Sequence, residues 1–131
     1  MQTVTSPAPV SKGALWTGRV LSALAVLVFV GGGIFSLLNA AKIAPQMAHY
    51  GFAEWHVKLI GWLEIICGIV YAIPRTAILG AVLLTGYLGG ATATHLRANE
   101  PPLAPLIVAA VLWLGIYLRE PRLHHIAPLR K

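Results

Sequence analysis

Charged side chains are scarce in this chain of 131 residues. They make up 11% of it and the acidic residues number only four, whereas hydrophobic residues make up 57%. Water-soluble domains carry about 25% charged residues, so a chain this poor in charge cannot cover a water-facing surface. The composition therefore excludes an ordinary water-soluble domain. It predicts a single domain that lies in an apolar solvent, the lipid bilayer.

Cysteine is nearly absent as well. Cys67 is the only cysteine of the sequence, and it lies within an apolar run. No intrachain disulfide can form, and a CxxC redox centre is excluded. We interpret Cys67 as a small core residue, so the fold does not depend on oxidation.

The formal net charge of +6 raises the question of nucleic-acid binding, but its distribution argues against it. Lysine and arginine occur in short clusters between apolar runs and not along one face. That pattern is typical of membrane topology signals, with attraction to anionic lipid as a consequence. Nucleic acid is therefore not an expected partner, and the lipid bilayer is.

Four apolar runs divide the chain. A helix rises 1.5 Å per residue, so about 20 apolar residues cross the hydrocarbon core, and lipid offers no partner to open backbone groups. The sequence thus predicts an all-α fold, a membrane-embedded four-helix bundle in a domain at 18–118. The four helices are expected at about 20–41, 57–73, 76–95 and 103–118.

The segments outside these runs are short. Pro74 and Arg75 leave so little chain between the second and third helices that these two should form an antiparallel hairpin. The other segments are a flexible N-terminal tail at 1–17, a loop at 42–55 broken by Pro45 and Gly51, a turn at 97–102 and a basic C-terminal tail at 119–131.

The distribution of basic residues predicts the orientation of the chain. Of the ten lysines and arginines, three lie at the ends of the helices that face away from the termini, namely Lys42, Lys58 and Arg97. The other seven lie in the two tails and the Pro74 turn. Because lysine and arginine concentrate on the inner side of a membrane, both termini are expected to be cytoplasmic.

Glu64 lies near the middle of the predicted second helix. A charged carboxylate at this depth costs at least about 2.5–3.5 kcal/mol, so it should face the bundle interior and be protonated or paired there. Gly61, Gly68 and Tyr71 fall on the same side of that helix, and the glycines let another helix come close. Two interpretations stay open: a carboxyl that relays protons or anchors a ligand, and one that holds helices together by a hydrogen bond.

The predicted third helix has a polar face of its own. Thr92 and His95 lie near its outer end, and Gly86 and Gly90 form a GxxxG spacing that suits close helix packing. His95 could titrate, bind a metal or donate to a quinone carbonyl. The alternative is a histidine at the water interface.

Polar residues gather in the outer half of the predicted bundle, which favours a pocket that opens on the outer side and ends near Glu64. No HxxxH or CxxC spacing supports a metal or haem site, so no metal ligand is predicted and haem is not expected. The residues of this outer set are Asn39, Lys42, His56, Glu64, Thr92 and His95.

Three segments resemble the DoxX-like family of small four-helix integral membrane proteins. They read GWLEIICGIVYAIPR at 61–75, GYLGGATATHLR at 86–97 and LWLGIYLREPRLHHIAPLR at 112–130. The resemblance implies a multi-pass protein of a bacterial-type inner (plasma) membrane, in a family that takes its name from a subunit of a thiosulfate:quinone oxidoreductase. Glu64 and the Gly89-Gly90 to His95 segment match the family pattern, which assigns neither a catalytic role.

The first functional hypothesis is a membrane subunit or accessory of a quinone-linked redox system that binds a lipophilic ligand near Glu64. Quinone is the candidate cofactor, and a redox partner protein would carry the electrons, because no flavin, nucleotide or iron–sulfur motif is present. The chain carries no self-sufficient catalytic motif. The alternatives are a non-enzymatic membrane assembly or scaffold protein and a small transporter that acts as a homo-oligomer.

Overall fold

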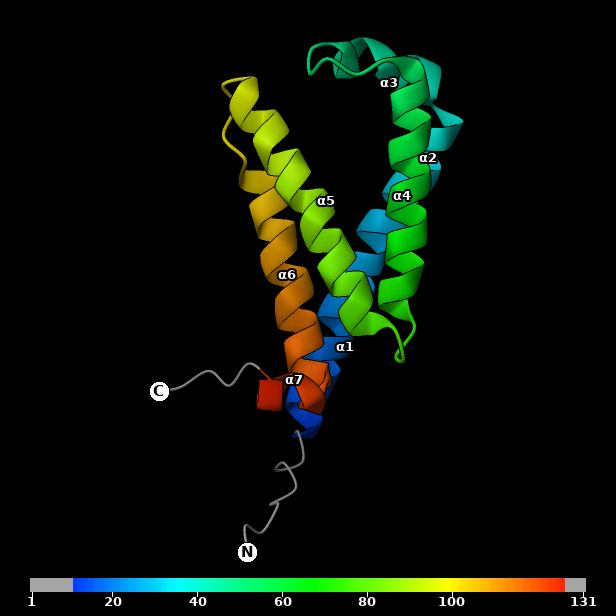
Figure 1. The fold of residues 1–131 in the computed structure, drawn as a ribbon. Coiled ribbons are helices and arrows are strands. Elements are labelled where there is room, and N and C mark those ends of the chain that lie inside the picture. Colours follow the sequence, from blue (N-terminus) through cyan, green and yellow to red (C-terminus); the bar gives the residue numbers. More distant parts are fainter. Residues whose placement is uncertain (1–10, 127–131) are drawn as a thin grey trace, which may run out of the picture.

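The structure is a computed structural model that describes residues 11–126, and every regular element in that range is a helix (Figure 1). An all-helical fold with apolar helices suited to a membrane is therefore confirmed. The elements are α1 (Lys12–Val26), η1 (Leu27–Gly31), α2 (Gly32–Leu38), α3 (Ala40–Ala48), α4 (Glu54–Ala72), α5 (Ala77–Arg97), α6 (Leu103–Arg119) and α7 (Pro121–Ile126).

The first three elements form one continuous helix of 27 residues, Lys12–Leu38, in which η1 is a single wider turn of the π type. Ser11 caps its start, where the Ser11 hydroxyl accepts a hydrogen bond from the amide of Ala14 at 3.2 Å. Residues 12–17, which were expected in the flexible tail, are helical because of this cap. The rest of that expected tail, at 1–10, lies outside the described residues.

Within residues 11–126, three helices are long and apolar enough to cross a membrane: Lys12–Leu38, α4 and α5. The apolar helix α6 is shorter, with 17 residues. Large hydrophobic side chains point outward from the bundle, among them Leu38 with 79% of its surface exposed and Leu27 with 69%. A surface that is apolar all round is typical of helices that lie in lipid.

The segment at 42–55 was expected to be a loop, but its first half is the helix α3 (Figure 1). Pro45 lies inside α3 and removes only one backbone donor from a short helix. The real break in the first span is Asn39, whose side-chain amide donates to the carbonyl of Phe35 at 3.0 Å. Gly51 ends the segment with a φ of 86°, which glycine adopts without strain.

The expected hairpin of α4 and α5 is present, and its tightest point is Gly80. A Cβ atom at Gly80 would lie 2.3 Å from the backbone nitrogen of Tyr71. The Thr76 hydroxyl closes the connection by donating to the carbonyl of Val70 at 2.8 Å. From this contact the two helices diverge toward their other ends (Figure 1).

Glycines also bring the first span against its two neighbours. A Cβ at Gly18 would lie 2.8 Å from the backbone nitrogen of Arg119, so the start of α1 and the end of α6 lie at the same end of the bundle. Farther along, a Cβ at Gly33 would lie 2.6 Å from the carbonyl oxygen of Gly61, and one at Gly68 would lie 2.9 Å from a methyl of Val30. Such close approaches are how small residues join helices in membranes.

We call the end with the start of α1, the α4–α5 hairpin and the end of α6 the base, and the opposite end, where α3 lies, the top (Figure 1). The best-packed part of the core lies near the base. Its fully buried large side chains are Tyr71, Leu84, Leu112 and Ile116. The helices are thus held together near the base, while α4 and α5 are separated at the top.

Candidate functional site

A cavity of about 560 Å³ lies between the diverging upper halves of α4 and α5, next to the turn that follows α3. Its volume falls within the ~300–1,000 Å³ that is common for small-molecule sites. The wall is mostly apolar, with two tyrosines, a threonine and a histidine among its members. The lining residues are Met47, Tyr50, Phe52, Ile60, Gly86, Tyr87, Gly90, Ala91, Thr94 and His95.

Gly86 and Gly90 do not join α5 to another helix of the described chain, in contrast to the packing expected from their spacing. A Cβ at either position would have no neighbouring atom within 4 Å, and both residues are exposed. They line the cavity instead. Because α4 and α5 diverge, no helix within residues 11–126 runs alongside α5 at these two glycines. They therefore face open space.

Tyr87 connects the cavity to Glu64. The Tyr87 hydroxyl donates a hydrogen bond to Oε1 of Glu64 at 2.5 Å, and this bond joins α5 to α4. Glu64 is half-buried, and its other oxygen lies 3.8 Å from the place where a Cβ of Gly32 would stand. The ring of Phe29 packs edge-on against Tyr87 with ring centres 6.0 Å apart, so the Tyr87 ring is held in place.

This phenol–carboxyl pair can exist in two hydrogen-bonding states. When Glu64 is ionised, its Oε1 accepts a hydrogen bond from the Tyr87 hydroxyl, which is the direction of the 2.5 Å contact. When Glu64 is protonated, it can donate to the phenol oxygen, and the Tyr87 hydroxyl is then free to donate into the cavity. Proton exchange through Tyr87 is the chemistry that this arrangement allows.

Tyr87 was not among the residues that the sequence singled out. A signal for it was present, because a tyrosine inside an apolar helix needs a partner for its hydroxyl. Within the predicted spans, the single acidic residue is Glu64. The sequence could not show that α5 turns this tyrosine toward α4, because the rotation of one helix against another is set by packing.

His95 lies in the upper part of the cavity wall. Its Nδ1 is 2.8 Å from the carbonyl oxygen of Ala91, and a neutral ring that donates there leaves Nε2 as an acceptor. The His95 ring is 5.8 Å from the ring of Tyr50, centre to centre. The structure therefore brings His95 and, through Tyr87, Glu64 to the same cavity.

His56 and Asn39 have local roles away from the cavity lining. Nδ1 of His56 accepts a hydrogen bond from the amide of Ala53 at 2.8 Å and so caps the start of α4, while the ring of Trp55 lies 3.7 Å away, centre to centre. Asn39 caps the end of α2. Neither side chain lines the cavity.

Thr92 and Tyr71 are also separate from the cavity lining. The Thr92 hydroxyl donates to the carbonyl of Leu88 on its own helix at 2.8 Å. Tyr71 is fully buried near the base, where its hydroxyl donates to the carbonyl of Leu112 at 2.7 Å and lies 3.2 Å from the hydroxyl of Ser22. Tyr71 therefore shares a helix face with Glu64 but belongs to the packed core.

A hydrogen bond joins two turns at the top of the bundle. The hydroxyl of Tyr50, which lines the cavity, donates to Oε2 of Glu100 in the turn between α5 and α6 at 2.6 Å. This hydrogen bond raises the pKa of Tyr50 above its usual value, so the phenol stays a neutral donor. Nε2 of His49 lies 3.5 Å from the other oxygen of Glu100. These two contacts connect the turn before α4 with the turn after α5, across the gap between the two helices.

Residues 11–126 contain no cluster of three or more histidine, cysteine or acidic side chains that could hold a metal ion. Cys67 is a free, half-buried thiol that packs against the core. The polar chemistry of the cavity is therefore that of its tyrosines, threonine and histidine, with Glu64 behind Tyr87.

These features are those of an integral membrane protein with a polar pair behind a cavity between two of its helices. Comparison with protein-family models gives a match to the DoxX-like family over residues 20–115. The chain belongs to the DoxX-like family, as the three sequence segments indicated. No curated protein and no solved structure matches the chain.

Proposed function

We propose that the chain crosses a bacterial-type inner membrane four times and that both termini are cytoplasmic. The 17 residues of α6 extend about 26 Å at 1.5 Å per residue, close to the ~30 Å of a hydrocarbon core. Among the described residues, five basic side chains lie toward the base and three toward the top. Those toward the base are Lys12, Arg19, Arg75, Arg119 and Arg122, and those toward the top are Lys42, Lys58 and Arg97.

Reporter fusions test this topology. A fluorescent protein that folds only in the cytoplasm should be bright when fused after Lys131. An alkaline phosphatase, which needs the oxidising side, should be active when inserted after Asn99 in the turn between α5 and α6. An inactive phosphatase at Asn99, with a fluorescent cytoplasmic reporter at the same place, would show that α6 does not cross or that the orientation is reversed.

We further propose that the cavity between α4 and α5 binds a lipophilic ligand that carries a polar oxygen, with a quinone as the first candidate. The residues present fit such a group. The cavity offers about 560 Å³ with a mostly apolar lining, and the Tyr87 hydroxyl and the His95 ring supply polar contacts. On this proposal the protein is a membrane subunit or accessory of a quinone-linked redox system.

The protein's own residues would handle protons in such a system. A protonated Glu64 can pass its proton to the oxygen of Tyr87 while Tyr87 donates its own proton into the cavity. The 2.5 Å bond gives the geometry for the first of these steps, and Tyr87 lines the cavity that would receive the second proton. A bound quinone would supply two-electron, two-proton redox chemistry, with the electrons taken from a partner protein.

The observation that carries this proposal is the Tyr87–Glu64 hydrogen bond at the cavity. Tyr87→Phe keeps the ring and removes the donor, so the affinity for a short-chain quinone should fall about tenfold or more. Glu64→Gln keeps a hydrogen-bonding partner for Tyr87 and does not line the cavity, so affinity should change by no more than about threefold. Calorimetric titration of the protein in nanodiscs measures both.

Tyr117→Phe is the matched control. Tyr117 is a half-buried tyrosine whose ring stacks on His124 near the base, with ring centres 4.3 Å apart. The same loss of a hydroxyl there should leave quinone affinity unchanged. Wild-type affinity in Tyr87→Phe, or an equal loss in Tyr117→Phe, would refute the proposed contact.

A scaffold role in which α5 packs against a partner or a second copy is the second candidate. It is favoured by Gly89, which is exposed and would have no atom within 4 Å of an added Cβ. Together with Gly86 and Gly90 it leaves part of the α5 surface flat, and small residues of this kind allow close helix contact in lipid. The glycine variants described in the Discussion distinguish this role from a ligand cavity.

A further inference from the structure

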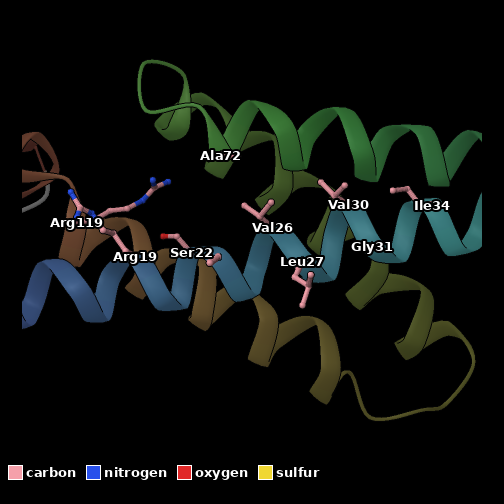
Figure 2. Close-up of a pocket in the computed structure, with 10 residues that line it drawn as sticks. Arg19, Ser22, Val26, Leu27, Val30, Gly31, Ile34, Ala72 and Arg119 are labelled. Carbon is pink, nitrogen blue, oxygen red and sulfur yellow. The ribbon is translucent and has the colours of Figure 1, made fainter.

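A second cavity of about 560 Å³ runs along the first span near the base (Figure 2). One wall of this cavity is a face of the first span that extends from α1 through η1 to α2. Ala72 at the end of α4 and Arg119 at the end of α6 also line the cavity. The apolar part is lined by Ala23, Val26, Leu27, Val30, Gly31 and Ile34. We call this feature the base groove.

Two arginines mark one end of the base groove, as Figure 2 shows for Arg19 and Arg119. Nη2 of Arg119 donates to the carbonyl of Tyr71 at 3.0 Å, and the guanidinium carbon lies 5.2 Å from the centre of the Tyr71 ring. The positive charge of Arg119 is therefore held in a fixed place. Its Nε is buried and has no hydrogen-bond partner among the described residues.

No carboxylate among the described residues forms an ion pair with either arginine, and the neighbouring Glu120, whose pKa is lowered mainly by Arg122 and less by Arg119, pairs with Arg122. Neither guanidinium has an acidic side chain within 4 Å in the described part of the chain. The sequence contains only four acidic residues, and each already has a partner elsewhere: Glu54 with Lys58, Glu64 with Tyr87, Glu100 with Tyr50, and Glu120 with Arg122. Two positive charges at the end of an apolar groove are complementary to an anionic amphiphile.

We propose that the base groove binds one anionic phospholipid, with its phosphate at Arg19 and Arg119 and an acyl chain along the first span. Arginine holds phosphate oxygens through paired hydrogen bonds. The stretch from Ser22 to Ile34 rises about 18 Å at 1.5 Å per residue, close to the ~15 Å of one leaflet of hydrocarbon. The proposal does not depend on the ligand cavity between α4 and α5, which lies at the opposite end.

The groove faces outward between helices, so a lipid can enter it sideways from the bilayer. Leu27 lines the groove and is 69% exposed, which shows that the groove opens to the surface of the described bundle. Basic pockets between spanning helices are a recognised way to hold anionic headgroups. The bound lipid would supply the negative charge that no described side chain places within 4 Å of Arg19 or Arg119.

Native mass spectrometry of the full chain tests the proposal, with phosphatidylglycerol or phosphatidylcholine added in detergent. The wild type should retain one phosphatidylglycerol with at least about tenfold preference over phosphatidylcholine. Arg19→Gln should reduce that preference about tenfold, because Arg19 has no carboxylate partner among the described residues and only the ring of Trp16, 6.0 Å from its guanidinium carbon, as a neighbour. Leu27→Trp, which fills the groove without touching either arginine, should reduce retention of both lipids.

Arg75→Gln is the matched control, since Arg75 is an exposed arginine in the α4–α5 connection that does not line the groove. It should leave the lipid preference unchanged. Equal retention of the two lipids by the wild type, or an equal loss in Arg75→Gln, would overturn the proposal. Displacement of the lipid by inorganic phosphate alone would also overturn it, because that would show an anion site without acyl-chain binding.

Discussion

Gly80→Leu is expected to prevent the α4–α5 hairpin from forming. A Cβ at Gly80 would lie 2.3 Å from the backbone nitrogen of Tyr71 and 2.4 Å from its Cα, so backbone atoms, which cannot swing aside, occupy the space. Even Gly80→Ala should cost about 1–3 kcal/mol, the usual range for overpacking, and leucine should cost more. The folded fraction in detergent, followed by circular dichroism during heating, measures the effect.

Gly89→Ala and Gly89→Leu are the controls for this prediction. Gly89 lies on the same helix, is exposed and has nothing within 4 Å of an added Cβ. Alanine there should be neutral or stabilise the helix by up to about 1 kcal/mol. A Gly80→Ala protein that melts like the wild type, or like Gly89→Ala, would show that α4 and α5 do not approach each other as closely as the structure has it.

The expected loss at Gly80 extends beyond the hairpin because Tyr71 lies at the centre of the core near the base. Its hydroxyl bonds the carbonyl of Leu112 on α6, and its own carbonyl accepts from Arg119. If a side chain added at position 80 displaces the backbone of Tyr71, both of these contacts between α4 and α6 are disturbed. The helices would then no longer be held together at the base. The cavity between α4 and α5 depends on that arrangement, because it lies where the two helices diverge.

The sequence predicted the helical membrane fold well, because continuous apolar runs leave the backbone few alternatives in lipid. It also predicted the α4–α5 hairpin, since Pro74 and Arg75 leave no room for a longer connection. It did not predict α3, because Pro45 and Gly51 suggested a loop. Pro45, the sixth of the nine residues of α3, removes only one backbone donor from this short helix. Only the conformation of Asn39 shows where the first span ends.

The sequence predicted individual residues of the candidate site, but it did not predict how the helices bring them together. The cost of a carboxyl in lipid singled out Glu64, and titratable chemistry singled out His95. Tyr87 and the open face at Gly86 and Gly90 depend on how α5 is rotated and tilted against α4. The rotation and tilt of α5 against α4 depend on the close contact between Gly80 and Tyr71 near the base. The periodicity of a single helix cannot show such a contact between two helices.

Gly90→Leu should abolish ligand binding while the bundle stays folded. Gly90 lines the cavity between α4 and α5, and an added Cβ there would meet nothing within 4 Å. The leucine side chain would therefore enter open cavity and occupy the space next to Tyr87 and His95 without displacing protein atoms. We expect the affinity for a short-chain quinone to fall at least about tenfold, with a melting temperature equal to that of the wild type.

Gly89→Leu gives this experiment its control, because it adds the same side chain one position away on a part of α5 that does not line the cavity. Calorimetric titration in nanodiscs should show wild-type affinity for Gly89→Leu and none for Gly90→Leu. Wild-type affinity in Gly90→Leu would refute the cavity as the binding site. If Gly89→Leu instead dissociates a complex that the wild type forms with a second copy or a partner, the open face of α5 is a helix-packing surface, because a leucine at that position would keep two backbones apart.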